Sequence, residues 1–126
     1  MSSIITWSLL ALSSIMIAGA QLLIKKGSLI TSQSQIQDSN FVIKIIRTIF
    51  EPHIFIALLI YVIGFFIWIK VLGQLELSRA YPVQISLVVI LTSIGAFFVF
   101  NESFNAIKIT AILIIIIGIA LLTINQ

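Results

Sequence analysis

The sequence has no cysteine, and among its 126 residues it has one histidine, two prolines and few charges. Without cysteine the chain forms neither a disulfide framework nor a thiolate metal site. Charged residues make up 9% of the chain. Ordinary soluble domains contain roughly 25%, so the composition excludes that class. The formal net charge of +3 is too small to indicate a nucleic-acid partner.

Residues that commonly carry catalysis are scarce. His53 has no second histidine or carboxylate cluster beside it, so we expect no metal site. The four carboxylates lie in separate connections: Asp38, Glu51, Glu76 and Glu102. The chain contains no G-x-S-x-G motif and no phosphate-binding glycine loop. We therefore expect that the protein is not an enzyme and uses no cofactor.

Apolar residues are abundant, at 60% of the chain, and they form four long runs. A run of about 20 apolar residues crosses the hydrocarbon core of a bilayer as a helix. The predicted spans are about 4–24, 54–73, 80–100 and 106–124. The expected fold class is an all-α membrane protein, with residues 1–126 forming one domain of four transmembrane helices.

The first span is expected to be a retained helix. Nothing basic precedes it and Lys25 and Lys26 follow it, which is the reverse of a signal peptide. Its polar and small residues share one helix face: Ser14, Ala18, Gln21 and Lys25. This face either packs against another helix or forms a polar stripe that lines a cavity.

A polar linker is predicted over 31–40, followed by an amphipathic segment at 41–51. Lys44 and Arg47 lie opposite its apolar side, as in a helix that lies in the membrane interface. The alternative is that this segment forms the first turns of the second span. Pro52 predicts a break between the two.

Lys70 lies about one turn before the end of the second span. An intramembrane lysine is a functional candidate, but near a helix end its ammonium can also reach the headgroups. The connection at 74–78 is too short for a domain, so the second and third spans form a hairpin.

The third span is the most polar of the four. Arg79 stands at its start and Pro82 is expected in its first turn, where proline costs least. Tyr81, Gln84 and Thr92 share one face. Their shared direction predicts a polar surface inside the bundle.

The fourth span is almost entirely aliphatic. Ala111 and Gly118 lie seven residues apart on one face, and small residues allow another helix to approach closely. We interpret this span as a packing or dimer helix. Four short spans do not easily enclose a pathway, so we expect an eight-helix dimer.

The distribution of basic residues predicts the orientation. Of the seven Lys and Arg residues, five fall on one side (Lys25, Lys26, Lys44, Arg47 and Lys108) and two on the other (Lys70 and Arg79). The positive-inside rule places the larger group in the cytoplasm and both termini outside.

Several short motifs resemble one family. Ala80-Tyr81-Pro82 opens a span, Asn101-Glu102 closes it, and Gly118 lies near the end of the next. Gln21-Leu22 before Lys25 and Trp68-x-x-Val71-Leu72 extend the pattern over most of the chain except 28–51. In order and spacing these motifs resemble the four-helix branch of the drug/metabolite transporter superfamily.

The chain shares features with two members of that branch. The small multidrug resistance proteins depend on a glutamate in the first helix, where this chain has Ile17. Isoleucine cannot exchange a proton for a cation. The chain more closely resembles undecaprenyl-phosphate-aminoarabinose flippase subunits, which also lack that glutamate. That resemblance implies translocation of a polyprenyl-phosphate-linked sugar across the inner membrane, by a homodimer or a heterodimer with a paralogous small subunit.

A lipid phosphate needs cations at headgroup level. The candidate substrate-binding residues are Gln21, Lys25, Lys70, Arg79, Tyr81 and Gln84, with Pro82 and Glu102 as family-motif residues. Alternatively, the lysines and the arginine are ordinary interfacial anchors. The alternative for Glu102 is that its negative charge stabilises the N-terminus of the fourth helix. The alternative functions are a multidrug-resistance-type exporter with altered coupling and a non-transporting accessory subunit.

Overall fold

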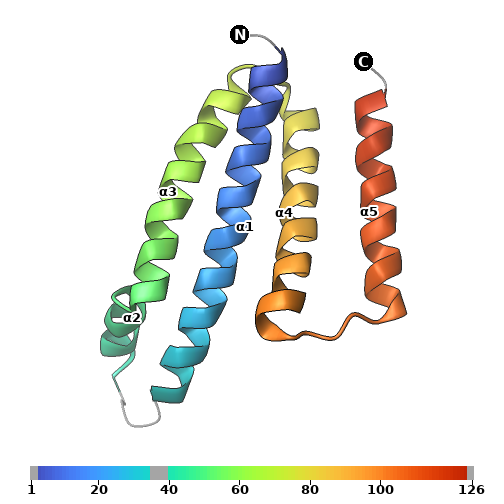
Figure 1. The fold of residues 1–126 in the computed structure, drawn as a ribbon. Coiled ribbons are helices and arrows are strands. Elements are labelled where there is room, and N and C mark those ends of the chain that lie inside the picture. Colours follow the sequence, from blue (N-terminus) through green and yellow to red (C-terminus); the bar gives the residue numbers. More distant parts are fainter. Residues whose placement is uncertain (1–2, 35–39, 125–126) are drawn as a thin grey trace.

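The structure is a computed structural model that describes residues 3–34 and 40–124. These residues form five helices and no strand. The helices are α1 (Ser3–Ser34), α2 (Phe41–Ile49), α3 (Pro52–Leu72), α4 (Leu77–Phe100) and α5 (Ala106–Ile124), as Figure 1 shows. Asp38 and the other linker residues at 35–39 lie outside the described residues.

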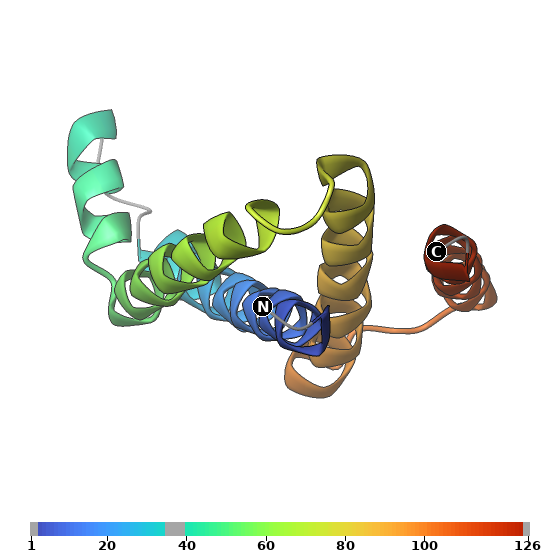
Figure 2. The ribbon, with the colours of Figure 1, turned by 90° about the horizontal axis from the view of Figure 1, so that it is seen from above.

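Helix α1 is the centre of the bundle, because it packs against both α3 and α4. A short turn joins α3 to α4, yet these two helices contact each other little and diverge from that turn (Figure 2). Helix α5 packs against α4 at the edge of the bundle, and the start of α1 and the end of α5 lie towards the same end of the bundle (Figure 1). In this arrangement α1 lies between α3 and α4, and α3 and α4 are largely separate from each other.

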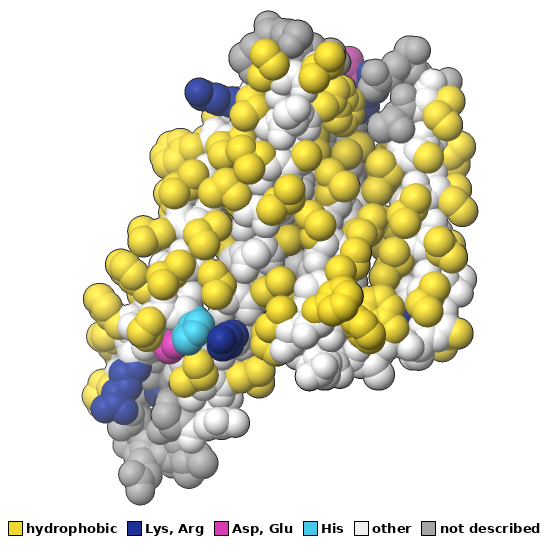
Figure 3. Space-filling view, in the orientation of Figure 1, with side chains coloured by type: hydrophobic (Ala, Val, Ile, Leu, Met, Phe, Trp, Pro, Cys, Tyr) yellow, Lys and Arg dark blue, Asp and Glu magenta, His cyan; other side chains and the backbone are white. Residues whose placement is uncertain are grey.

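Three helices in the described chain are long and apolar enough to cross a membrane. They cover Ile4–Gln33, Pro52–Leu72 and Leu77–Phe100. Large apolar side chains on their outer faces are exposed, among them Phe66 at 63% and Phe98 at 74%. Figure 3 shows hydrophobic side chains along the helices on this face and charged ones towards the ends. Such extensive apolar exposure requires lipid rather than water, so the protein is an all-α, membrane-embedded protein.

Small residues bring α1 and α3 together. On α1 the buried series is Thr6, Ser13, Ala20 and Gly27, and on α3 it is Ala57, Gly64 and Val71. Each series has a spacing of seven residues, which keeps one seam facing the partner helix. A Cβ on Gly64 would lie 3.5 Å from Met16, so the two helices are already in van der Waals contact. Close backbone approach is the usual basis of helix association in lipid.

Helix α1 is longer than the sequence suggested, because it continues ten residues past the predicted end of the span at residue 24 and reaches Ser34. The first part of the predicted linker, from residue 31, is therefore helical. No helix-breaking residue follows Lys26 except Gly27, and Gly27 is buried against Glu51 and Ile54. The Thr31 hydroxyl donates to the Gly27 carbonyl at 2.9 Å, which keeps its polar group within the helix.

Helix α2 is separate from α3. The chain leaves the helical conformation at Phe50 and Glu51, and the Glu51 carboxylate accepts a hydrogen bond from the Ile54 N–H at 3.0 Å. This is an N-cap, so α3 has its own start at Pro52. Helix α2 lies crosswise to the long helices in Figure 2, in the direction that an interfacial helix takes. The segment is therefore not the first turns of α3.

Helix α4 begins at Leu77, three residues before the predicted start. The N–H groups of Arg79 and Ala80 bond the Glu76 carbonyl at 3.0 and 2.9 Å, which starts the helix early. The prediction that Pro82 lies in the first turn is consequently wrong, because Pro82 occupies the second turn, inside the helix. There its ring removes one helical hydrogen bond.

Candidate functional site

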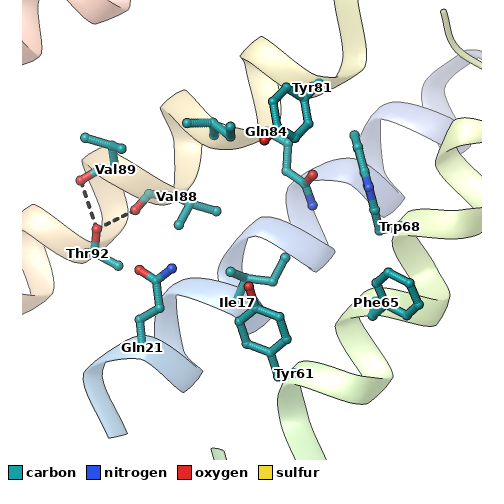
Figure 4. A pocket seen from close by; sticks show the side chains of 11 residues that line it. Ile17, Gln21, Tyr61, Phe65, Trp68, Tyr81, Gln84, Val88, Val89 and Thr92 are labelled. Carbon is teal, nitrogen blue, oxygen red and sulfur yellow. Dashed lines mark hydrogen bonds between the residues drawn. The ribbon is translucent and has the colours of Figure 1, made fainter. Parts of the chain in front are cut away.

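A cavity of about 500 Å³ lies where α3 and α4 diverge above α1. We call it the aromatic groove. Eleven residues line it: Ile17 and Gln21 from α1, Tyr61, Phe65 and Trp68 from α3, and Tyr81, Gln84, Ile85, Val88, Val89 and Thr92 from α4. Figure 4 shows these side chains converging from the three helices. Phe65 is 52% exposed and Tyr81 is 53% exposed, so the groove is open along one side.

One wall of the groove is aromatic. Tyr61, Phe65 and Trp68 follow one another at helical spacing on α3, so their rings share one face. Tyr81 stands across from them on α4 (Figure 4). Tyr61 and Phe65 are not among the predicted site residues, although their helical spacing from Trp68 is visible in the sequence.

Two amides bring polarity to the groove. Gln84 is buried, and its Nε2 donates to the Ser13 hydroxyl at 3.4 Å, which links α4 to α1. Gln21 makes no hydrogen bond with any other described residue, and its amide points into the groove (Figure 4). The Thr92 hydroxyl is occupied within α4, donating to the Val88 carbonyl at 2.7 Å. Gln21 is therefore the amide that is available to a ligand.

A second cavity of about 280 Å³ adjoins the first and shares Gln21 and Thr92 with it. Its lining includes Lys25, Glu102 and Lys108, which we call the ion cluster. The Glu102 carboxylate forms an ion pair with Lys25 through Oε1, and its Oε2 lies 3.5 Å from the Lys108 Nζ. The aromatic groove therefore leads directly to two cations held by one carboxylate.

The ends of two helices position Glu102. Asn101 ends α4 in the left-handed conformation, with φ of 51°, and the Glu102 N–H bonds the Ala96 carbonyl at 3.4 Å. Asparagine tolerates this conformation better than most residues. The start of α5 is capped by Asn105, whose side chain accepts from the Lys108 N–H at 2.8 Å. Glu102 thus pairs with two lysines, whereas Asn105 supplies the side-chain hydrogen bond at the start of α5.

The aromatic rings near the cluster also contact its cations. The Lys25 Nζ lies 4.8 Å from the centre of the Phe100 ring, and the Lys108 Nζ lies 5.7 Å from that of Phe104. Both distances fall within the range of cation–π attraction. The lysine side chains are 44% and 50% exposed, so solvent or a ligand can reach them.

The structure brings four of the six predicted substrate-binding residues together. Gln21, Tyr81 and Gln84 line the aromatic groove, and Lys25 lies in the adjoining cavity. Lys70 is exposed on α3 and Arg79 is half-buried at the start of α4, both near the other end of the bundle and outside the two cavities. Lys108 was not predicted as a site residue, and its ion cluster joins residues that are distant in sequence.

The predicted packing residues on α5 have no partner helix in the described chain. Ala111 and Gly118 are both exposed, and a Cβ on Gly118 would meet no atom within 4 Å. Among the side chains of α5 that the structure describes, the half-buried ones are Ile112, Ile115 and Ile119, and Ile119 packs against the core around Leu10. The face with the small residues therefore remains open.

The described residues contain no cluster of three or more His, Asp or Glu side chains that is arranged to hold a metal ion. Comparisons of the chain with protein-family models, with curated proteins and with solved structures found no significant match.

Proposed function

We propose that the protein is a membrane transporter or flippase that moves a polyprenyl-phosphate-linked sugar or a similar amphiphile across the inner membrane. The observation that carries the proposal is the continuity of the aromatic groove with the ion cluster through Gln21 and Thr92. The two adjoining cavities thus place aromatic rings, an amide and two lysines one after another in space. These are the groups that a sugar and a phosphate on an apolar chain would need.

The groove suits a sugar better than a purely apolar ligand. Aromatic faces stack on the apolar face of a sugar ring, and the Gln21 amide has both donors and acceptors available for hydroxyl groups. The open side of the groove, marked by the exposed Phe65 and Tyr81, supports the passage of a ligand whose chain stays in lipid. A headgroup inside and a chain outside is the arrangement that a lipid flippase requires.

The ion cluster lies at the basic end of the bundle. Helix α2 carries Lys44 and Arg47, the start of α5 carries Lys108, and the later part of α1 carries Lys25 and Lys26, and these segments lie towards the same end of the bundle (Figure 1). The positive-inside rule favours this end for the cytoplasm. A phosphate that enters from the cytoplasmic leaflet would contact the ion cluster first. Near the opposite leaflet, Lys70 and Arg79 would contact the phosphate.

The proposal includes α5 as a fourth span and a dimer of two subunits. Helix α5 has 19 residues. At 1.5 Å per residue such a helix is about 28 Å long, close to the thickness of the hydrocarbon core. Its exposed face with Ala111 and Gly118 supports close contact with a helix of a second subunit. The partner would be a second copy or a paralogous small subunit.

Native mass spectrometry of the gently extracted protein tests both parts of the proposal. We expect a dimer that retains a polyprenyl-phosphate-linked lipid. A Trp68→Ala variant removes one ring of the groove and should retain less of this lipid, whereas Phe66→Ala, which changes a ring outside the groove, should not. A dimer with bulk phospholipid alone contradicts the lipid cargo, and a monomer bound to a larger protein indicates the accessory subunit.

A small cation exporter is the second candidate, and the aromatic lining favours it. Tyr61, Trp68 and Tyr81 offer ring faces to a cation. No carboxylate lines the groove in the described chain, and Ile17 contributes an aliphatic side chain there. Saturable binding of a quaternary ammonium compound that Trp68→Ala weakens would support this candidate, with coupling that does not depend on a carboxylate in the groove.

A further inference from the structure

The ion cluster contains one carboxylate between two ammonium groups from different parts of the chain. Lys25 belongs to α1, Glu102 to the connection between α4 and α5, and Lys108 to the first turn of α5. Each oxygen of the Glu102 carboxylate faces one lysine. A phosphate group also presents several oxygens to neighbouring cations. Glu102 thus occupies the place that an anionic headgroup would take.

The charges in this cavity leave room for such an anion. Two lysines face a single carboxylate, so the cluster has an excess of one positive charge. No other acidic side chain lines the cavity among the residues that the structure describes. If the Glu102 carboxylate turned away, the two ammonium groups would face each other across an open cavity without a counter-ion, which favours the entry of an anion.

Neutral donors are also present. The Ser93 hydroxyl lines the cavity and makes no hydrogen bond with another described residue, and the same holds for the Gln21 amide. Both groups can donate to phosphate oxygens. Gln21 also lines the aromatic groove, so an anion at the lysines would have the next group of its molecule beside the rings.

Glu102 is held in a way that permits exchange. It lies in the non-helical connection 101–105, and its side chain is 30% exposed. Ion pairs between partly exposed groups are weak, because water competes for both partners. Exchange of this carboxylate for a phosphate would replace one pair of contacts with another of the same kind.

We propose that Lys25 and Lys108 form a phosphate-binding site that Glu102 closes, and that the phosphate group of a phosphate ester opens the site by displacing the carboxylate. The inference rests on the proposed function for the nature of the cargo, and it adds the headgroup site and an internal competitor. A free phosphate ion and a lipid phosphate share the chemistry that the two lysines recognise.

The binding of farnesyl phosphate to the purified protein in detergent tests the inference, with farnesol and inorganic phosphate as the other two probes. Glu102→Gln removes the competing charge, and we expect it to bind farnesyl phosphate about tenfold more tightly than the wild type. Its affinity for farnesol should not change. Glu76→Gln, which changes a carboxylate at the opposite end of the bundle, is the matched control and should bind as the wild type does.

Lys108→Gln provides an independent measurement, which also serves if Glu102→Gln does not fold. This variant should bind farnesyl phosphate more weakly, while the control Lys44→Gln, which changes a lysine of α2 outside both cavities, should not. Equal or weaker binding by Glu102→Gln, or unchanged binding by Lys108→Gln, overturns the inference. Tighter binding of inorganic phosphate by Glu102→Gln, equal to the gain for farnesyl phosphate, supports the site and identifies the free ion as its ligand.

The proposed function can fail separately. If Glu102→Gln shows the expected gain in affinity but the wild type does not translocate a lipid-linked sugar in vesicles, the phosphate-binding site is supported and the transport function is contradicted. If translocation occurs and the gain in affinity is absent, the transport function is supported and the proposed role of Glu102 is contradicted.

Discussion

Gln84 on α4 donates a hydrogen bond to Ser13 on α1, with 3.4 Å between Nε2 and Oγ, and both side chains are buried. Ser13 in turn donates to the Leu10 carbonyl at 2.9 Å. This chain of hydrogen bonds lies directly behind the groove, since Gln84 is also one of the residues that line it. The hydrogen bond therefore holds the side of the groove that α4 forms against the side that α1 forms.

The first prediction concerns this hydrogen bond. Gln84→Leu and Ser13→Ala should each lower the free energy of unfolding in detergent or bicelles. A double-mutant cycle should give a coupling of about 0.6 kcal/mol, the average for hydrogen bonds between membrane helices, and no more than about 1.7 kcal/mol. A coupling indistinguishable from zero would show that the two side chains contribute independently.

The second prediction concerns the close contact at Gly27. A Cβ there would collide with the Glu51 carboxylate and with Ile54, so the carboxylate would have to leave its N-cap on α3. Loss of a cap costs about 1 kcal/mol. We expect Gly27→Ala to unfold more easily than Gly19→Ala by about that amount. Gly19 is the matched control because it lies on the same helix and its Cβ would meet no atom within 4 Å.

Both of these glycines lie within α1, so the gain in helix propensity from alanine is similar at the two positions and cancels in the comparison. Thermal unfolding of the two variants in the same detergent gives the difference. Equal stability of the two variants would contradict the close packing of α1 against the start of α3.

The third prediction concerns pH. Partial desolvation acts to raise the pKa of Glu51, but hydrogen bonds from His53 and the Ile54 N–H, together with the His53 charge, lower that pKa below its usual 4.5. The His53 Nδ1 lies 2.8 Å from the Glu51 Oε1. A carboxyl group with a lowered pKa in the folded state stabilises the fold above its unfolded pKa, and this contribution disappears as pH falls through the folded pKa.

We therefore expect the melting temperature of the wild type to fall as the pH decreases from neutral to below about 4. Glu51→Gln should have a lower melting temperature than the wild type at neutral pH, and its melting temperature should fall less over the same pH interval. Parallel curves for the two proteins would show that Glu51 does not carry the acid sensitivity.

The fourth prediction concerns water in the groove. The chain has no cysteine, so a single introduced cysteine reports on its own position. Thr92→Cys, which lines both cavities, should react with a membrane-impermeant maleimide, and Ser13→Cys, which is fully buried, should not. Protection of residue 92 would favour an accessory subunit with a dry interface over a transporter.

The sequence pattern predicted the apolar helices because long uncharged runs have few alternatives in lipid. It did not predict the end of α1, since Lys25 and Lys26 suggest a membrane boundary and yet do not break a helix. The polar stripe on α1 shows that helical spacing alone does not tell whether a polar helix face packs against another helix or lines a cavity. Ser14 and Ala18 are buried in helix packing, whereas Gln21 and Lys25 line cavities, so each of the two interpretations holds for one half of the stripe.

The ion cluster could not be predicted from spacing. Lys25 and Glu102 are 77 positions apart, and they meet only because α4 returns along α1 and Asn101 turns the chain at its end. The divergence of α3 from α4 is equally a property of packing, because a short turn normally suggests two helices in close contact. The groove exists where that expectation does not hold.

Translocation of a fluorescent polyprenyl-phosphate-linked sugar in proteoliposomes tests the central claim most directly. Quenching from outside measures how much of the labelled lipid has crossed the bilayer. We expect the wild type to move the lipid faster than protein-free vesicles do. Tyr81→Ala should slow the movement, and Phe66→Ala should not. Equal rates with and without the protein, for both homodimeric and co-reconstituted paired subunits, would contradict the proposed lipid transport.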